Sequence, residues 1–580
     1  MLWYFLSKLN RNDGRAPLHH ALIALCATPV LSWAAQPPSQ ETLDRSEQES
    51  LEQFRRFEGW QDELNERFLN EPDIFLDTPQ IPLAEEPEED AGPCFPITEV
   101  RLVSDEYDRF QWLEKNLNDA LPPDNCIGAD GINRMMTEAQ NEVIGAGFVT
   151  SRVVAEAQDM NSGVLSLTLL PGYVEDVRFV DGVPRRATYW NALTMRPGDL
   201  LNLRHIEQAL ENFKRVPSVD VNIDIEPGEE PGYSDLVIQW SQGDPLRVTE
   251  TLDNSGSESN GIYQAGVTIN YDPYWAFNDL FYLSYTQSIV FDHDDRGSQG
   301  VNGHYSIPYG YWLLSFNGGI SENFQMIDGA IEAYKYGGVN SNQSVKLERT
   351  LFRNDRNKLS GHLSVQARQS SNYINDVEIE VQRRRSSSLE AAVNHQLFMG
   401  PATVSSGLTY KLGLMAFGAI EDPEVARGDG VENPQWVTMN TGYRRPFQWL
   451  NQNWNIDSQI KAQANITQLI PRDQFSIGSA YSVRGFNGGF SGESGFYWRN
   501  DLAWVVPAWP YLPGRGHQLT LGLDAGTIFA EEQYLAGSSL ALKGQLWGLS
   551  YENSLSFPLL SPESLETEGA IVRFQISKSF

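Results

Sequence analysis

The chain has 580 residues, a formal net charge of −33 at pH 7 and a hydrophobic fraction of 41%. This length predicts several domains. The acidic balance argues against a nucleic acid as partner, because binding to phosphates requires a basic patch.

The N-terminus has the pattern of an export signal. Basic residues precede an apolar run over residues 21–31, and Ser32 and Ala34 supply small residues at the two positions that a signal peptidase reads. We therefore expect residues 1–34 to be removed as a signal peptide. No later uninterrupted apolar stretch reaches the ~20 residues of a membrane-spanning helix, so the mature chain is either soluble or crosses a membrane as strands.

Three cysteines are present, and Cys26 lies within the signal. Cys94 and Cys126 then remain as a pair in an oxidising compartment, where a disulfide is expected. A zinc site would need further ligands, and the eight histidines show no ligand spacing. We expect neither a metal nor a cofactor.

Residues 35–93 combine an amphipathic helix with a linker. Apolar residues recur at helical spacing from Phe54 to Leu69, which predicts a helix over residues 41–70. Three prolines and the acidic run 85–90 follow. Such a segment buries too little apolar surface to fold, so we expect a tether between the helix and the folded modules.

Residues 94–245 contain one mixed α/β pattern twice, in the order β-α-α-β-β, and an internal repeat outranks any single local assignment. The first copy, residues 94–172, has predicted strands over 97–103, 149–156 and 164–170 and helices over 110–117 and 132–144. The second copy, residues 173–245, has predicted strands over 174–180, 219–225 and 235–240, a short helix over 189–193 and a longer one over 203–213.

From residue 246 to residue 580, alternation with period two replaces helical periodicity, and clusters of Gly, Asn, Asp and Ser separate the segments. The segment from Tyr263 to Tyr271 has an apolar face with aromatic residues at both ends and a polar opposite face. This is typical of a membrane strand with interfacial aromatic girdles. At ~10 residues per strand plus turns and loops, about 330 residues accommodate roughly 14 to 18 antiparallel strands.

The last eleven residues, 570–580, alternate in the same way. Val572, Phe574, Ile576 and Phe580 share one face, and polar residues occupy most of the other. A lipid-facing row that ends on an aromatic residue is typical of an outer-membrane barrel. An edge strand of a soluble sandwich is the alternative for this segment taken alone.

The segment from residue 481 to residue 501 carries recognisable sequence. It contains Val483-Arg484-Gly485-Phe486, and the stretch Gly522-Leu523-Asp524-Ala525-Gly526 follows downstream. In this order, and with the terminal Phe580, the residues closely resemble the transporters of two-partner secretion. That family includes the haemolysin secretion/activation proteins and belongs to the superfamily of the outer-membrane barrel insertase. The resemblance covers residues 94–580.

The resemblance implies a mostly β protein in the outer membrane of a Gram-negative bacterium. It implies a 16-stranded transmembrane antiparallel barrel over residues 246–580, two periplasmic POTRA modules, an N-terminal amphipathic plug helix, and a long loop folded into the pore with residues 483–486 at its tip. Outer-membrane lipid would surround the barrel, and the barrel-assembly machinery would be a partner during biogenesis. Docking of the helix on the POTRA surface is the alternative to a plug.

Strand parity gives the motif a physical role. On the strand over residues 519–529, Gly522, Asp524 and Gly526 face inward. A carboxylate in a confined lumen needs a partner, and the planar fork of Arg484 can bind Asp524 at two places. The inward glycines leave room beside the wall for the loop. The alternative is that Arg484 is a solvated charge at an extracellular loop tip and Asp524 one of many lumen acids.

The resemblance implies export of a large unfolded partner protein, haemolysin-like or adhesin-like, from periplasm to cell surface. The modules would bind its N-terminal secretion domain, by strand addition or in an apolar groove beside a helix. A barrel-assembly insertase is the alternative, although it would have more POTRA repeats, and a passive porin would have no use for tandem modules. We expect no enzyme, because no nucleophile, base and orienting acid stand in a recognisable motif.

Overall fold

The computed structural model describes residues 40–580 except 70–71, 79, 84–93, 124, 181, 183–185, 291–294, 330–331, 508–513, 530–532, 566 and 568. The predicted signal peptide and the acidic run 85–90 lie outside the described residues. Among the described residues, no helix combines the length and the apolar composition that a membrane crossing requires.

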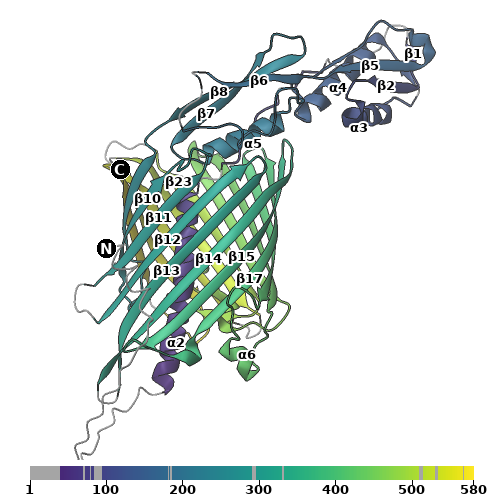
Figure 1. Cartoon of the computed structure of the whole chain (residues 1–580). Helices are drawn as coiled ribbons and strands as arrows, with labels where there is room; N and C mark the ends of the chain where they lie inside the picture. The colour runs from purple at the N-terminus through teal and green to yellow at the C-terminus, as the bar shows by residue number, and fades with distance from the viewer. Residues whose placement is uncertain are drawn as a thin grey trace, which may run out of the picture.

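Sixteen long antiparallel strands close into a barrel, and the two-residue strand β16 extends the loop between β15 and β17 (Figure 1). The first and last strands complete the ring, with Thr249 opposite Ser579 and Asp253 opposite Gln575. The strands are β9 (Leu246–Asp253), β10 (Tyr263–Tyr271), β11 (Leu280–Ile289), β12 (Arg296–Tyr309), β13 (Trp312–Asp328), β14 (Ala333–Arg353), β15 (Asn357–Ile374), β16 (Val377–Glu378), β17 (Arg384–Met399), β18 (Ala402–Leu414), β19 (Gln435–Trp449), β20 (Gln452–Asn465), β23 (Gly495–Val505), β24 (Arg515–Ile528), β25 (Gln533–Leu546), β26 (Leu549–Leu560) and β27 (Ile571–Ser579).

The alternation in the sequence separates the two faces of the barrel wall. On β24, Leu521 and Leu523 are half-exposed on the outer surface. Asp524, the residue after Leu523, is buried inside the barrel. On β12, the polar residues Asn302 and Ser306 are buried in the lumen. An apolar outer face and a polar interior are the two environments of a membrane barrel strand.

The first α/β module has a three-stranded sheet with the order β2-β5-β4, in which β2 and β5 are parallel. Phe110 and Leu113 pack from a helix onto Leu165 and Leu167 of the sheet, and all four are fully buried. The elements are β1 (Phe95–Pro96), β2 (Glu99–Val103), α3 (Tyr107–Asp119), β3 (Cys126–Ile127), α4 (Ala129–Gly145), β4 (Arg152–Val154) and β5 (Val164–Leu170).

The second α/β module repeats the sheet, with the order β6-β8-β7 and β6 parallel to β8. Its core includes Val174, Leu201, Ile206 and Phe213, all fully buried. The elements are β6 (Tyr173–Phe179), α5 (Leu203–Lys214), β7 (Val219–Pro227) and β8 (Tyr233–Gln242).

The short helix predicted over residues 189–193 is wrong: these residues form a single turn. The carbonyl of Tyr189 accepts hydrogen bonds from the Leu193 N–H at 2.8 Å and from the Ala192 N–H at 3.1 Å. The side-chain amide of Asn191 then donates to the Pro308 carbonyl of the barrel at 3.0 Å. A single helical turn is hardly stable by itself, because helix nucleation is unfavourable. Contacts with the barrel therefore determine the path of the chain here.

The second module is docked on the strand ends at one mouth of the barrel (Figure 1). The side-chain amide of Asn212 on α5 donates to the Gly310 carbonyl in the turn between β12 and β13 at 2.8 Å. The hydroxyl of Ser218 donates to the Asp272 carbonyl at 2.7 Å. These bonds anchor the module at two separate barrel turns.

Helix α2 (Gln40–Phe68) runs through the barrel lumen (Figure 1). The side-chain amide of Gln61 donates to Asn302 of β12 at 2.9 Å and accepts from Asn342 of β14 at 3.0 Å. Phe57 fits against Gly319 of β13, where an added Cβ would lie 2.7 Å from its ring. The amphipathic helix is therefore bound to the wall inside the pore, and the alternative position on the modules is wrong.

Candidate functional site at the pore loop

The loop between β20 and β23, residues 466–494, turns back into the barrel. It contains β21 (Phe475–Ile477) and β22 (Phe490–Gly492), which pair antiparallel with Phe475 opposite Gly492 and Ile477 opposite Phe490. We refer to residues 466–494 as the pore loop. The short hairpin within it directs the motif of residues 483–486 toward the barrel wall.

Arg484 of the pore loop forms a bidentate ion pair with Asp524 of β24. Its Nε donates to Asp524 Oδ2 at 2.6 Å and its Nη2 donates to Oδ1 at 2.7 Å, and its backbone N–H donates to Oδ2 at 3.0 Å. The Asp524 side chain is 0% exposed. A buried carboxylate is stabilised by a partner of this geometry, and removal of the partner would leave it uncompensated.

A second carboxylate joins the pair. Asp501 Oδ1 of β23 lies 2.8 Å from Arg484 Nη2. Sequence reasoning did not assign a role to Asp501, although the register places it directly opposite Gly522. Strand parity on β23 was the signal that could have identified it.

Glycines on the wall and in the loop allow this close approach. A Cβ added at Gly522 would lie 2.6 Å from the Arg484 guanidinium carbon, and one added at Gly526 would lie 2.9 Å from Val483 Cγ2. Gly485 has a φ of +98°, in the left-handed region that glycine adopts without strain. Side chains at Gly522 and Gly526 would push the loop away from β24.

The apolar residues of the motif shield the ion pair. Val483 is fully buried and Phe486 is 3% exposed. They pack with the barrel residues Tyr497, Ile528 and Leu535 in one cluster. Exclusion of water by this cluster strengthens the electrostatic attraction between Arg484 and its carboxylates.

The pore loop also contacts α2. Arg55 of the helix donates to the Pro471 carbonyl at 2.7 Å. Arg368 on β15 lies 2.9 Å from Glu58 of the helix and 3.2 Å from Asp473 of the loop. Helix and loop are thus joined both directly and through the barrel wall.

A cavity of about 770 Å³ lies beside the end of α2, toward the mouth that carries the modules. Its lining includes the cationic side chains of Arg67, Arg247, Arg515 and Lys543. The lumen is therefore not completely filled by the helix and the loop. Displacement of the helix would join this cavity to the space that the helix occupies.

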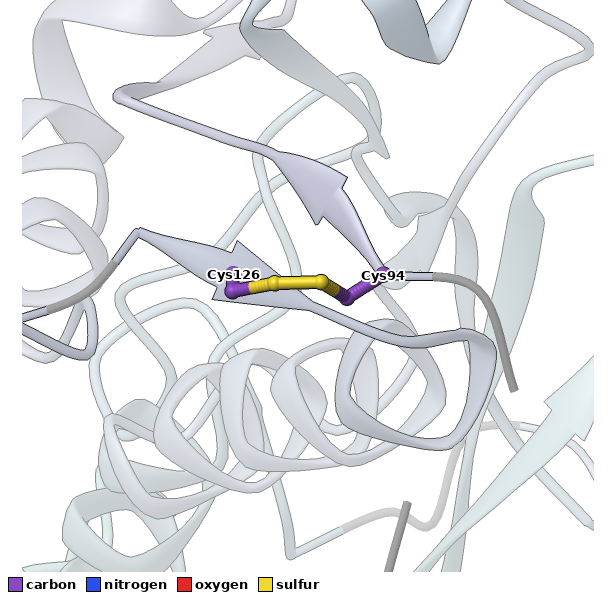
Figure 2. The surroundings of a disulfide bond; sticks show 2 residues. All are labelled: Cys94 and Cys126. Atoms are coloured by element: carbon purple, nitrogen blue, oxygen red, sulfur yellow. A yellow bond between two sulfur atoms is a disulfide. The ribbon is translucent and has the colours of Figure 1, made fainter. Parts of the chain in front are cut away.

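The structure places the other predicted site residues away from the loop. Cys94 and Cys126 are joined in a disulfide beside the paired strands β1 and β3 (Figure 2). Phe580 pairs with Val248 through two backbone hydrogen bonds, of 2.9 and 3.3 Å, and the residue is 62% exposed. In the described part of the chain, no cluster of three or more His, Cys, Asp or Glu side chains could hold a metal ion.

A closed barrel with an internal helix, an inward loop and two α/β modules at one mouth defines an outer-membrane protein transporter. The family described as haemolysin secretion/activation protein ShlB/FhaC/HecB matches residues 232–550. A POTRA domain matches residues 173–227, and a POTRA domain of ShlB type matches residues 95–172. The chain belongs to this haemolysin secretion/activation family.

Relatives of the chain are transporters. It is 31% identical over 467 residues to the outer membrane transporter CdiB-2 of Burkholderia pseudomallei (strain 1026b), covering 78% of this chain and 79% of the relative. It is 24% identical to the hemolysin transporter protein HpmB of Proteus mirabilis, covering 67% and 69%. The chain is therefore an outer-membrane translocator of two-partner secretion, with its POTRA domains in the periplasm.

Solved structures share the fold. CdiB from Acinetobacter baumannii superposes with a TM-score of 0.79 at 25% identity, covering 92% of this chain and 99% of that chain. CdiB from Escherichia coli gives 0.77 at 24% identity, covering 95% and 100%.

Proposed function

We propose that the POTRA domains capture the N-terminal secretion domain of one large unfolded partner protein, and that capture opens the pore for its export. The supporting observation is that α2 and the pore loop occupy the lumen together and contact each other. Export then requires both to move. Binding of the partner can drive this only if the partner binds the open state more tightly than the closed one.

The ion pair of Arg484 with Asp524 acts in this proposal as the latch of the pore loop. Val483 and Phe486 seat the tip, and Gly522 and Gly526 form the recess that receives it. Because Asp524 is buried, separation of Arg484 from Asp524 is unfavourable until another interaction replaces the ion pair. The latch would therefore hold the pore loop in the position that the arriving partner engages, which makes the ion pair necessary for export.

We infer a signal peptide at 1–34, the plug helix and linker at 35–93, POTRA domains at 94–172 and 173–245, and the barrel at 246–580. Lipid contacts the apolar outer face, and the barrel-assembly machinery recognises the end at Phe580. We infer that export needs no catalytic residue, metal or cofactor of this chain, and that folding of the partner outside the cell supplies the driving force.

The test requires the exported partner, which we expect to be a large protein encoded by a neighbouring gene. Cells that carry both proteins should release the partner into the medium. Removal of the partner's N-terminal secretion domain should leave the partner in the periplasm at an unchanged amount of transporter in the outer membrane. Full release of the truncated partner would overturn the proposal.

A further inference from the structure

The linker after α2 is docked on the POTRA domains rather than free. The backbone N–H of Ile74 donates to Glu211 Oε1 at 3.0 Å, and that of Leu76 donates to Glu207 Oε1 at 2.9 Å. Both carboxylates stand one helical turn apart on α5. The helix thus binds two alternate N–H groups of an extended chain.

A third contact of the same kind lies on the first POTRA domain. The side-chain amide of Asn141 on α4 accepts from the Ile81 N–H at 2.8 Å and donates to the Ile81 carbonyl at 2.9 Å. An amide that pairs with both groups of one residue recognises the main chain and not the side chain. Any extended polypeptide presents the same groups.

The side chains of the docked segment alternate in direction, as in a strand. Ile74 and Leu76 pack against the core of the second POTRA domain. Phe75 between them faces the barrel, with its ring centroid 4.0 Å from that of Phe398 at the end of β17. The segment is held between α5 and the periplasmic rim of the barrel.

The two carboxylates are fixed by the barrel. Arg353 at the end of β14 lies 3.0 Å from Glu207 Oε2 and 2.7 Å from Glu211 Oε1, and it also donates to the Ile74 carbonyl. Glu207 is fully buried, and burial raises the pKa of its carboxyl while Arg204 and Arg353 oppose that shift. Departure of the linker would take the Leu76 N–H from Glu207 and the Ile74 N–H from Glu211, and the loss of these two hydrogen bonds is unfavourable unless another chain replaces them.

We propose that the α5 face between Glu207 and Glu211, with Phe398 and Arg353 of the barrel rim, is a binding site for an extended polypeptide with aliphatic residues at alternate positions. The linker occupies this site at rest, and an extended segment of the secreted partner takes its place. This inference rests on the proposed export function. The partner is the expected occupant because the site recognises main-chain groups and lies at the periplasmic mouth that an exported chain must pass.

The position of the site connects capture to opening of the pore. Asp73 belongs to the docked segment, because its Oδ1 lies 3.1 Å from Lys358 Nζ on β15. It follows Phe68, the last residue of α2, by five residues, which span at most about 18 Å when extended. Exchange of the linker for the partner would therefore release the periplasmic end of the plug helix. The same event would bring the partner to the barrel mouth.

The test uses the full-length protein and a labelled synthetic peptide with the sequence of residues 72–83. In the wild type, the peptide competes with a tethered copy of itself at high effective concentration, so it should bind weakly. Ile74→Asp combined with Leu76→Asp should free the site and raise the peptide affinity by about tenfold or more. The matched control is Leu83→Asp, since Leu83 is 49% exposed and its change should leave the linker in place.

A change in the peptide tests the hydrogen bonds without altering the protein. N-methylation of the amides of Ile74 and Leu76 should lower affinity for the freed site by about tenfold or more, because both bonds go to charged acceptors. Methylation of the amides of Phe75 and Asp77 is the control and should have a much smaller effect. Equal losses for the two peptides, or no binding of the unmodified peptide to the freed site, would overturn the inference.

The export assay separates this inference from the proposed function. If the wild type exports its partner but the peptide does not bind the freed site, the inference is wrong and the export function stands. If the partner is not exported by the wild type, the export function is wrong whatever the peptide does. Displacement of the bound peptide by an isolated secretion domain of the partner would support both.

Discussion

Gly59 of the plug helix lies against the ring of Tyr481 in the pore loop, so closely that an added Cβ would be 3.2 Å from two ring carbons. The Tyr481 hydroxyl donates to Glu63 one turn further along the helix at 3.3 Å. The two elements that fill the lumen are therefore in direct contact. Movement of one changes the packing of the other.

A larger side chain at position 59 should push the plug helix and the pore loop apart. We expect Gly59→Leu to raise single-channel conductance in planar bilayers, because its side chain requires the space of the Tyr481 ring. Gly59→Ala is the control, since one methyl group at 3.2 Å needs only a small shift and favours the helix by up to about 1 kcal/mol. Equal conductance of the two variants would show that the contact does not hold the pore closed.

Deleting the helix tests its role as a plug. Removal of residues 41–70 should raise conductance further than Gly59→Leu, because the lumen then loses the whole helix. Heat-modifiable migration in electrophoresis should stay normal, since the strands of the barrel close through their own backbone hydrogen bonds. An unchanged conductance would contradict a plug that blocks ions.

Arg484→Ala should stop secretion of the partner while the amount of folded barrel in the outer membrane stays near the wild-type level. Loss of the guanidinium leaves Asp524 buried and unpaired, which destabilises the loop position by roughly 3 to 5 kcal/mol if water does not reach the site. Arg484→Lys should restore little, because a point charge cannot form the bidentate bonds. The measurement is partner in the medium against barrel in the membrane. Full secretion by Arg484→Ala would remove the latch from the mechanism.

Asp501 and Asp524 should differ in importance. The side chain of Asp501 is 28% exposed, whereas that of Asp524 is 0% exposed and accepts three hydrogen bonds from Arg484. We therefore expect Asp501→Asn to reduce secretion far less than Asp524→Asn, because solvent screens the exposed charge. Equal losses in the same assay would mean that the two carboxylates act as one unit.

The disulfide should stabilise the first POTRA domain. Cys94 and Cys126 are 32 residues apart, and closing a loop of this size contributes roughly 3 to 4 kcal/mol in the chain-entropy model. The double Cys→Ser variant should show faster proteolysis and amide exchange in residues 94–172 than in the barrel. Reduced wild type is the control and should behave like the variant. Two free thiols in the unreduced mature protein would contradict the bond.

The sequence alone was sufficient for features that depend on neighbours in the chain. Alternation over residues 263–271 and 570–580 identified barrel strands and their outer faces, because a strand reports its two environments with period two. Helical periodicity over residues 41–70 identified α2 to within a few residues. Parity along β24 placed Gly522 and Asp524 on the inner face without any structure.

Contacts between distant segments were decided only by the tertiary structure. An amphipathic helix fits a lumen or a domain surface equally well, and only Asn302 and Asn342 on the wall show which surface Gln61 meets. Asp501 joins Arg484 because of strand register, and the linker residues Ile74 and Leu76 are ordered by carboxylates more than 130 positions away. Periodicity identifies which side of an element is apolar or polar, but it carries no information about which partner that side contacts.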